Sequence, residues 1–324
     1  MSPARRNEIR LPFFIVGAAR SGTTLVRLML NEHRRVTIPR ESWFLSDLMD
    51  KLPIGCPLSP AQVGQAYSLI VGHERWKDWD IPNGALLDAL TGLTEPRLDQ
   101  LVEAVFQLVA TEDSGPRWGD KTPEYVREIT RLHRLFPEAK FIHVIRDGRD
   151  VSISLRKTKW RGSSVRATAC FWRDYVLAGM QQGRGLPDRL YLEVAYEDIV
   201  TSPEDELTRI CEFLSLPFDP KMMDFHQQAH RNIAAWEKDI HRKTTRPPRP
   251  SDVQRWKREM SAFEVLVFES VTAAAMDRAN YRRMYRGPLR LLPLLFRLVD
   301  RLMEVSLPLR RRLGIHFPKL SRHI

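Results

Sequence analysis

The segment 13–27 combines an apolar strand, a turn bracketed by two glycines and an apolar-periodic helix, a pattern suited to binding an anion. Gly17 and Gly22 let the backbone bend tightly, so that the amides of the turn point inward at the positive end of the helix. The residues able to hold an anionic ester there are Arg20, Ser21, Gly22, Thr23 and Thr24. The pattern predicts a phosphate cradle, and a glycine-rich turn without a ligand is the other interpretation.

This cradle differs from the loop that binds nucleoside triphosphates. That loop reads G-x-x-x-x-G-K-[ST], in which the lysine reaches the terminal phosphates and the hydroxyl binds magnesium. Here Thr23 stands at the lysine position, and a cation, Arg20, lies within the turn instead. A metal-free phosphate or phosphosulfate therefore fits better than ATP with its metal, and we predict no metal site.

A second basic cluster follows a predicted strand at residues 140–145. Arg146 comes directly after this strand, and Ser154 lies on the following helix, about two turns further on. Ligands bind beyond the carboxyl ends of parallel strands, so Arg146 and the cradle are expected to line one crevice. Arg146 and Ser154 can reach a single phosphate. An Arg–Asp salt-bridge corner within residues 146–150 is the alternative.

Three motifs together resemble the sulfotransferase family over most of residues 11–260. They are the cradle, the run Ile145-Arg146-Asp147-Gly148-Arg149-Asp150-Val151 with Ser154, and Tyr196-Glu197-Asp198-Ile199 followed by Ser202-Pro203. The resemblance implies 3'-phosphoadenosine 5'-phosphosulfate (PAPS) as cosubstrate and its bisphosphate (PAP) as product. It assigns the cradle residues 20–24 to the phosphosulfate, Arg146 and Ser154 to the 3'-phosphate, and Tyr196 to the same cosubstrate site. The cradle sequence is closer to the tyrosylprotein and bacterial branches than to the cytosolic one.

The resemblance also implies which groups act on the acceptor. In the tyrosylprotein branch a glutamate shortly after the first helix removes the acceptor proton, and Glu41 occupies that place. Its alternative role is to complement the dipole of a helix near 42–50. Lys121, in a segment similar to one in bacterial members, is expected with Arg20 to stabilise the departing phosphate. The alternative for Lys121 is a polar turn closed by Pro123.

The late segment 242–257 is rich in proline and basic residues, so we predict a loop. Sulfotransferases close their sites with a comparable late basic segment, and Ser251 and Arg255 are the matching candidates for cosubstrate binding. The segment lacks the Arg-Lys-Gly triplet of the cytosolic branch, and a solvated linker is the alternative.

The 324 residues, 43% of them hydrophobic, can bury one large core with a small helical subdomain. The predicted fold is α/β, a P-loop-type three-layer fold with a central, mostly parallel sheet. Residues 1–286 form the sulfotransferase domain, and 51–116 form a helical insertion on the acceptor side. Its Trp76 and Trp79 are suited to stacking on a sugar or ring, or to filling the insertion's own core. Strands are expected at 12–16, 36–38, 140–145 and 189–194, and helices at 22–33, 42–50, 97–112, 124–135, 148–158, 164–182 and from Ser202-Pro203.

Residues 287–324 form a basic tail with an amphipathic helix at 289–305. With a basic flank up to residue 312, and a net charge of +11, this helix can lie on an anionic membrane surface, or it can pack on the domain or on a second subunit of a homodimer. Three separated cysteines and the lack of a signal peptide pattern suit a cytoplasmic protein.

We therefore predict an enzyme that transfers the sulfuryl group from PAPS to a hydroxyl of a carbohydrate, lipid or small-molecule acceptor. A P-loop-type kinase or a nucleotide-binding protein using ATP is the alternative, because Ile145-Arg146-Asp147 can imitate the acidic partner of a metal. Nucleic acid is not expected as a partner, because no recognition-helix, RNP or zinc-finger pattern is present.

Overall fold

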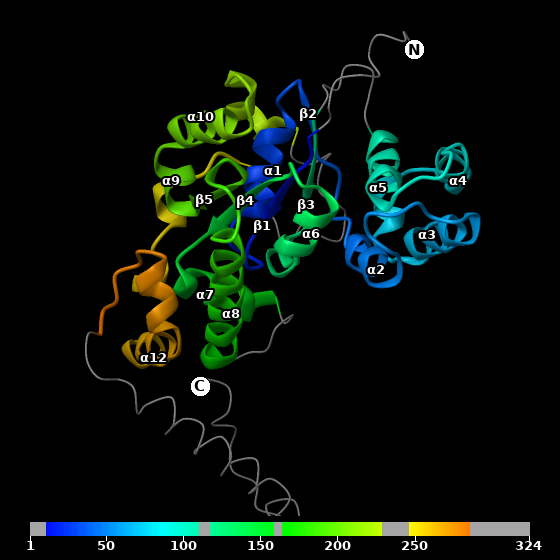
Figure 1. The fold of residues 1–324 in the computed structure, drawn as a ribbon. Coiled ribbons are helices and arrows are strands. Elements are labelled where there is room, and N and C mark those ends of the chain that lie inside the picture. Colours follow the sequence, from blue (N-terminus) through cyan, green and yellow to red (C-terminus); the bar gives the residue numbers. More distant parts are fainter. Residues whose placement is uncertain (1–10, 110–116, 159–163, 229–245, 286–324) are drawn as a thin grey trace, which may run out of the picture. The chain divides into compact units, whose positions relative to one another are not determined.

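Five strands form one sheet in the order β2-β3-β1-β4-β5, and every neighbouring pair runs parallel (Figure 1). In this computed structural model the strands are β1 (Phe13–Val16), β2 (Val36–Thr37), β3 (Arg117–Lys121), β4 (Lys140–Ile145) and β5 (Tyr191–Ala195). All four residues of β1 are buried, as is typical of a central strand covered on both faces. The predicted α/β fold with a parallel sheet is confirmed.

The structure describes residues 11–109, 117–158, 164–228 and 246–285. The chain divides into two compact units, Met1–Ile145 with Ala178–Pro250, and Arg146–Leu177 with Ser251–Ile324. The first unit contains the whole sheet, and the described part of the second is helical. Among the described residues, no helix is both long and apolar enough to cross a bilayer. The predicted tail helix at 289–305 lies outside them, so its contact with a membrane or a second subunit stays a prediction.

The helices of the first unit were predicted in part. The predicted ones include α1 (Thr23–Asn31) and α10 (Pro203–Phe213), and the predicted segment 124–135 forms η3 (Pro123–Arg127) and α6 (Ile129–Leu135). The helix α9 (Tyr196–Thr201) and the 3-10 helices η4 (Asp188–Leu190) and η5 (Pro220–Gln227) were not predicted. The predicted helix 124–135 is divided, because the backbone leaves the helical region at Glu128, between η3 and α6. Ser202 and Pro203 stand at the N-cap and first position of α10 as predicted, although the Ser202 side chain makes no capping hydrogen bond.

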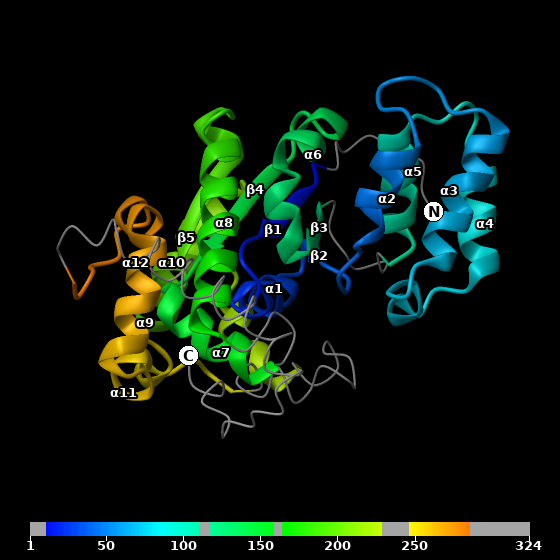
Figure 2. The same cartoon turned by 90° about the horizontal axis from the view of Figure 1, so that it is seen from below.

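The predicted insertion 51–116 contains α3 (Pro60–Gly72), η2 (Trp76–Trp79), α4 (Asn83–Thr91) and α5 (Leu98–Gln107) in its described part. Together with α2 (Phe44–Lys51), which precedes it, the insertion forms a helical cap beside the β2–β3 side of the sheet (Figure 2). Trp76 and Trp79 are buried, with ring centroids 5.8 Å apart, and Trp79 meets Phe106 of α5 at 5.1 Å. Phe106 in turn stacks on Trp118 of β3 at 4.0 Å. The two tryptophans therefore fill the core of the cap, and their rings do not present a surface to a sugar.

The described elements of the second unit pack around α7 (Gly148–Thr158). They are α8 (Val165–Gly183), which runs on into the first unit, and η8 (Pro250–Asp252), α11 (Trp256–Glu259) and α12 (Ala262–Arg278). A Cβ on Gly148 would lie 2.4 Å from the Trp172 ring of α8 and 2.6 Å from the Phe268 ring of α12. Only glycine therefore allows these two helices to pack this close to the start of α7. The prediction that 242–257 forms a loop throughout is wrong over its described end, where η8 and α11 form.

Candidate active site

The turn after β1 has the backbone geometry of an anion cradle. Arg20 adopts a left-handed conformation with φ 74°, and Gly22, the N-cap residue of α1, has φ 102°. Alternation of left- and right-handed residues turns successive amides towards one side of the chain, which is the geometry of an anion-binding nest. The sequence predicted this turn from its glycines but gave no sign that Arg20 would share the strained backbone.

Close packing from behind shapes the cradle. A Cβ on Gly17 would lie 2.4 Å from the Val144 carbonyl oxygen of β4, and a Cβ on Gly22 would lie 2.3 Å from the Tyr196 ring. Tyr196 is thus brought to the cradle as predicted, although β5 and α9 are distant from it in sequence. The buried hydroxyl of Ser21 has no hydrogen-bond partner among the described residues. A buried donor without a partner at this position fits an anionic ligand.

Lys121 joins the cradle to the predicted base. Its Nζ donates a hydrogen bond to Thr24 Oγ1 at 3.2 Å and forms an ion pair with Glu41 Oε1. The sheet register explains this contact, because Lys121 is the last residue of β3 and pairs with Ile15, two residues before Gly17, where the turn of the cradle begins. The Lys121 side chain is 3% exposed. The alternative of a polar turn at Asp120 and Lys121 closed by Pro123 is wrong, since both residues lie buried in β3.

Glu41 lies before α2, which begins at Phe44, so it does not complement the first turn of that helix. Its Oε2 accepts a hydrogen bond from Trp43 Nε1 at 2.7 Å. Burial acts to raise the pKa of Glu41, but Lys121, Trp43 and Arg75 outweigh it and hold the pKa below its usual value. Glu41 is therefore ionised at neutral pH, and its side chain keeps 15% exposure to solvent.

A buried polar cluster supports the residues around Glu41. Thr122 Oγ1 donates to Asp120 Oδ1 at 2.8 Å and accepts from the Ser42 amide at 3.2 Å. Tyr125 OH lies 2.9 Å from Ser42 Oγ and accepts from the Leu45 amide at 3.1 Å. Burial raises the pKa of Asp120 to about 7, against the hydrogen bonds of its neighbours. The cluster ties the end of β3 to the segment that carries Glu41.

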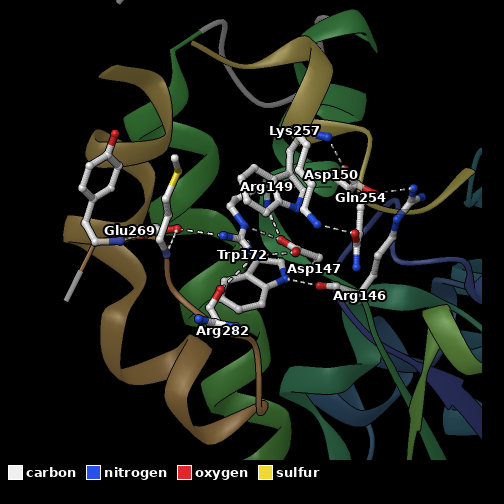
Figure 3. A network of polar contacts seen from close by, with 12 residues as sticks. Arg146, Asp147, Arg149, Asp150, Trp172, Gln254, Lys257, Glu269 and Arg282 are labelled. Carbon is white, nitrogen blue, oxygen red and sulfur yellow. Dashed lines mark hydrogen bonds and ion pairs between the residues drawn. The ribbon is translucent and has the colours of Figure 1, made fainter. Parts of the chain in front are cut away.

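The second basic cluster is a buried salt-bridge corner, as its alternative interpretation proposed (Figure 3). Arg146 Nη2 donates to the Asp252 carbonyl oxygen at 2.9 Å and lies 3.4 Å from Asp150 Oδ2. Arg149 bonds both oxygens of Asp147 and also Glu269 Oε1, the latter at 2.7 Å. The corner does not exclude a role for Arg146 in binding a phosphate, because a guanidinium has five donors.

Three other predicted site residues also belong to the second unit. Ser154 lies half-buried on α7, and Ser251 is exposed in η8. Arg255, just before α11, forms a double hydrogen bond with Glu259 at 2.8 and 3.0 Å. The two candidates for the 3'-phosphate, Arg146 and Ser154, thus share one unit with Ser251 and Arg255, while the cradle, Lys121 and Glu41 share the other. That all of them line one crevice stays a prediction.

Sequence reasoning missed Trp43, which faces Glu41 from a left-handed backbone conformation with φ 53°. A bulky residue with positive φ is unusual and marks strain that is often found at functional sites. Nothing in its type or spacing indicated this, because the contact depends on a local backbone angle. The positions of Asp120, Thr122 and Tyr125 behind Glu41 were missed for a similar reason, since strand register decides them.

The model of the sulfotransferase family matches residues 12–220 of the chain. The chain belongs to the sulfotransferase family. The match includes the cradle, Glu41, Lys121, Arg146 and Tyr196, so the resemblance inferred from these motifs is confirmed at the level of the family.

Relatives include the protein-tyrosine sulfotransferase A of Caenorhabditis elegans, 28% identical over 69% of this chain and 55% of that protein. The nodulation protein NoeE of Sinorhizobium fredii is 28% identical over 64% of this chain and 50% of its own length. The chain thus spans about half the length of these two relatives. Among solved structures, a sulfotransferase domain from the Synechococcus PCC 7002 olefin synthase has a TM-score of 0.60 at 21% identity, covering 87% of this chain and 98% of that domain. This likeness shows that the fold is shared.

Proposed function

We propose that the protein transfers the sulfuryl group of PAPS to a hydroxyl of an acceptor. The observation that carries this proposal is the position of the Lys121 ammonium, which bonds Thr24 of the cradle and the Glu41 carboxylate at once. A cation held between an anion cradle and a carboxylate is the arrangement that transfer of an anionic group to a deprotonated hydroxyl requires. Family membership supports the same chemistry.

The cradle would hold the phosphosulfate. Arg20, Ser21, Gly22, Thr23 and Thr24 supply a guanidinium, hydroxyls and backbone amides at the start of α1, where the helix dipole favours negative charge. The partnerless Ser21 hydroxyl fits this ligand. We propose that Arg146, Ser154, Ser251 and Arg255 bind the 3'-phosphate, and that Tyr196 packs behind the cradle.

Glu41 is the proposed general base. As the acceptor oxygen forms its bond to sulfur, the hydroxyl proton passes to the Glu41 carboxylate, and the bond between sulfur and the phosphate oxygen breaks to release PAP. Lys121 and the cradle amides stabilise the negative charge that develops on the departing phosphate. The low pKa of Glu41 keeps it ionised and ready to accept a proton at neutral pH.

The acceptor we propose first is a phenolic hydroxyl, with carbohydrate, lipid and other small-molecule hydroxyls as alternatives. A carboxylate with a lowered pKa is a weak base, and a phenol with a pKa near 10 gives up its proton more easily than an aliphatic alcohol. The relative named as a protein-tyrosine sulfotransferase points the same way. Transfer from PAPS to a tyrosine peptide that exceeds transfer to a sugar alcohol would support the phenol, and the reverse order would contradict it.

Calorimetry with PAP and with ATP and magnesium tests the cosubstrate. We expect PAP to bind more tightly by a wide margin, whereas the alternative kinase function predicts the opposite order. Glu41→Gln should leave PAP binding unchanged and lower turnover on the order of a hundredfold or more, because the base is lost. Asp50→Asn, an exposed carboxylate on α2 that pairs with Arg131, is the matched control. Turnover retained in Glu41→Gln would place the base elsewhere.

A further inference from the structure

One buried carboxylate in the second unit bonds two segments that lie a hundred residues apart. Asp150 is fully buried on α7. Its Oδ2 lies 3.4 Å from Arg146 Nη2, and its Oδ1 accepts the Trp256 amide at 2.8 Å. Arg146 itself donates to the Asp252 carbonyl oxygen at 2.9 Å. Both members of the Arg146–Asp150 pair therefore bond residues 251–257 of the late segment.

Arg149 reinforces the same junction (Figure 3). The Arg149 guanidinium stacks on the Trp256 ring, 3.6 Å from the ring centroid. The same guanidinium forms ion pairs with Asp147 and Glu269. Glu269 also accepts the amides of Met284 and Tyr285 at 3.0 and 2.8 Å. The first residue of α11 is therefore fixed by its amide, through Asp150, and by its ring, through Arg149.

Fixing Trp256 and Asp252 also fixes the candidates that lie beside them. Ser251 and Arg255 are each the immediate neighbour of an anchored residue, and neither is itself bonded to Asp150 by its side chain. When several side chains bind one phosphate, the affinity for that phosphate is higher if their backbone is already held in place, because less conformational entropy is lost on binding.

We propose that Asp150 is a positioning residue for recognition of the 3'-phosphate. Its two oxygens hold Arg146 and the late segment in one arrangement, so that the protein distinguishes a nucleotide with a 3'-phosphate from one without it, although Asp150 does not touch the nucleotide. This inference rests on the proposed function, because PAPS is the source of that phosphate.

The test compares PAP with 5'-AMP, which lacks only the 3'-phosphate. Calorimetry on the full chain should show that wild-type protein prefers PAP. In Asp150→Asn the affinity for PAP should fall on the order of tenfold, because the charge-assisted bond to Arg146 is weakened, while the affinity for AMP stays within about twofold. Asp277→Asn on α12, where the carboxylate pairs with Arg283, is the matched control and should keep the wild-type ratio.

A double-mutant cycle separates positioning from general loss of structure. If Asp150 acts in part through Arg146, adding Asp150→Asn to Arg146→Gln should lower PAP affinity by less than Asp150→Asn does in the wild-type protein. Should Asp150→Asn unfold, Asp150→Glu keeps the buried charge, displaces the carboxylate by one methylene and should lower the same ratio. Equal loss of PAP and AMP affinity, or no loss in a folded variant, would overturn the inference. A wild-type protein that does not prefer PAP would instead contradict the proposed function.

Discussion

Two buried ion-paired clusters in this molecule differ in how completely their charges are bonded. Arg149 uses four of its five N–H donors, on Asp147, Glu269 and the Arg282 carbonyl oxygen, with Trp256 beneath its plane. The two carboxylate partners of Arg149 are almost fully buried. Lys121, by contrast, bonds one carboxylate and one hydroxyl, and that carboxylate, Glu41, remains partly exposed.

This difference separates structural from chemical roles. A buried charge whose donors are nearly all satisfied by protein groups has little capacity left for a ligand, and removing it leaves its partners unpaired. A pair at the rim of a cradle, with capacity left on the lysine and the carboxylate, can exchange partners when a substrate arrives. The difference supports a structural role for the Arg149 cluster and the proposed catalytic role for the Lys121–Glu41 pair.

The largest effect is expected when the Arg149 cluster is broken. Arg149→Met should lower the free energy of unfolding by about 3–5 kcal/mol, because Asp147 and Glu269 would stay buried without their cation. Urea unfolding measures this change. The control is Arg156→Met on the same helix α7, which removes a partly exposed arginine that pairs with Glu264 of α12 and should lower the free energy of unfolding by about 1 kcal/mol or less. Equal losses in the two variants would contradict the structural role of Arg149.

The second expected effect concerns the Lys121–Glu41 pair. Lys121→Met should lower turnover on the order of a hundredfold, because it removes a cation from the developing negative charge. It should also cost less stability than Arg149→Met, since Glu41 keeps partial exposure and its bond from Trp43.

The pH profile of the same variant sharpens the assignment. Lys121 contributes to holding the pKa of Glu41 below its usual value, and without it burial should raise that pKa. The acidic limb of the turnover profile should therefore move to higher pH in Lys121→Met and stay near its wild-type position in Lys121→Arg. An acidic limb at the same pH in Lys121→Met would show that Glu41 is not the group that titrates.

The last expected effect concerns Asp120, which lies behind the proposed catalytic pair. Its folded-state pKa of about 7 lies above the usual 3.8, so between these values the folded protein holds a proton that the unfolded chain has lost. Stability should therefore fall as pH rises from about 4 to 7, with Asp120 contributing on the order of 1 kcal/mol per pH unit. In Asp120→Asn the free energy of unfolding, measured by urea unfolding at several pH values across that range, should lack this contribution. Asp88→Asn, exposed on α4, is the control, and an unchanged slope in Asp120→Asn would show that Asp120 is ionised throughout.

Much of the first unit could be predicted because its signals are local. The buried run of β1, the glycines of the cradle and the Ser202-Pro203 start of α10 each depend on neighbouring residues. In the cap, α2 and α5 form where helices were predicted at 42–50 and 97–112, whereas α3 and α4 were predicted only as part of a helical insertion, since they are short and their apolar faces are defined by their neighbours. The division at Glu128 and the short helix α11 were missed because packing, rather than propensity, sets where such short elements begin and end.

The candidate site shows the same limit. The family motifs indicated Arg20, Glu41 and Lys121 separately, but only the pairing of Ile15 with Lys121 shows why the lysine reaches the cradle. Motifs likewise indicated Arg146 and Ser154, but they gave no sign that Asp150 bonds the Trp256 amide or that Arg149 stacks on the Trp256 ring, because Trp256 is about a hundred residues away along the chain.

The sequence by itself determined that strands alternate with helices, that an anion cradle follows the first strand, and which side chains have the chemistry to act beside it, because these properties are set by residue type and short-range spacing. Only the tertiary structure decided which of those charges are bonded to each other. Strand register and helix packing bring together residues that the chain keeps far apart, and burial then decides whether a given pair holds the fold or stays available to a substrate.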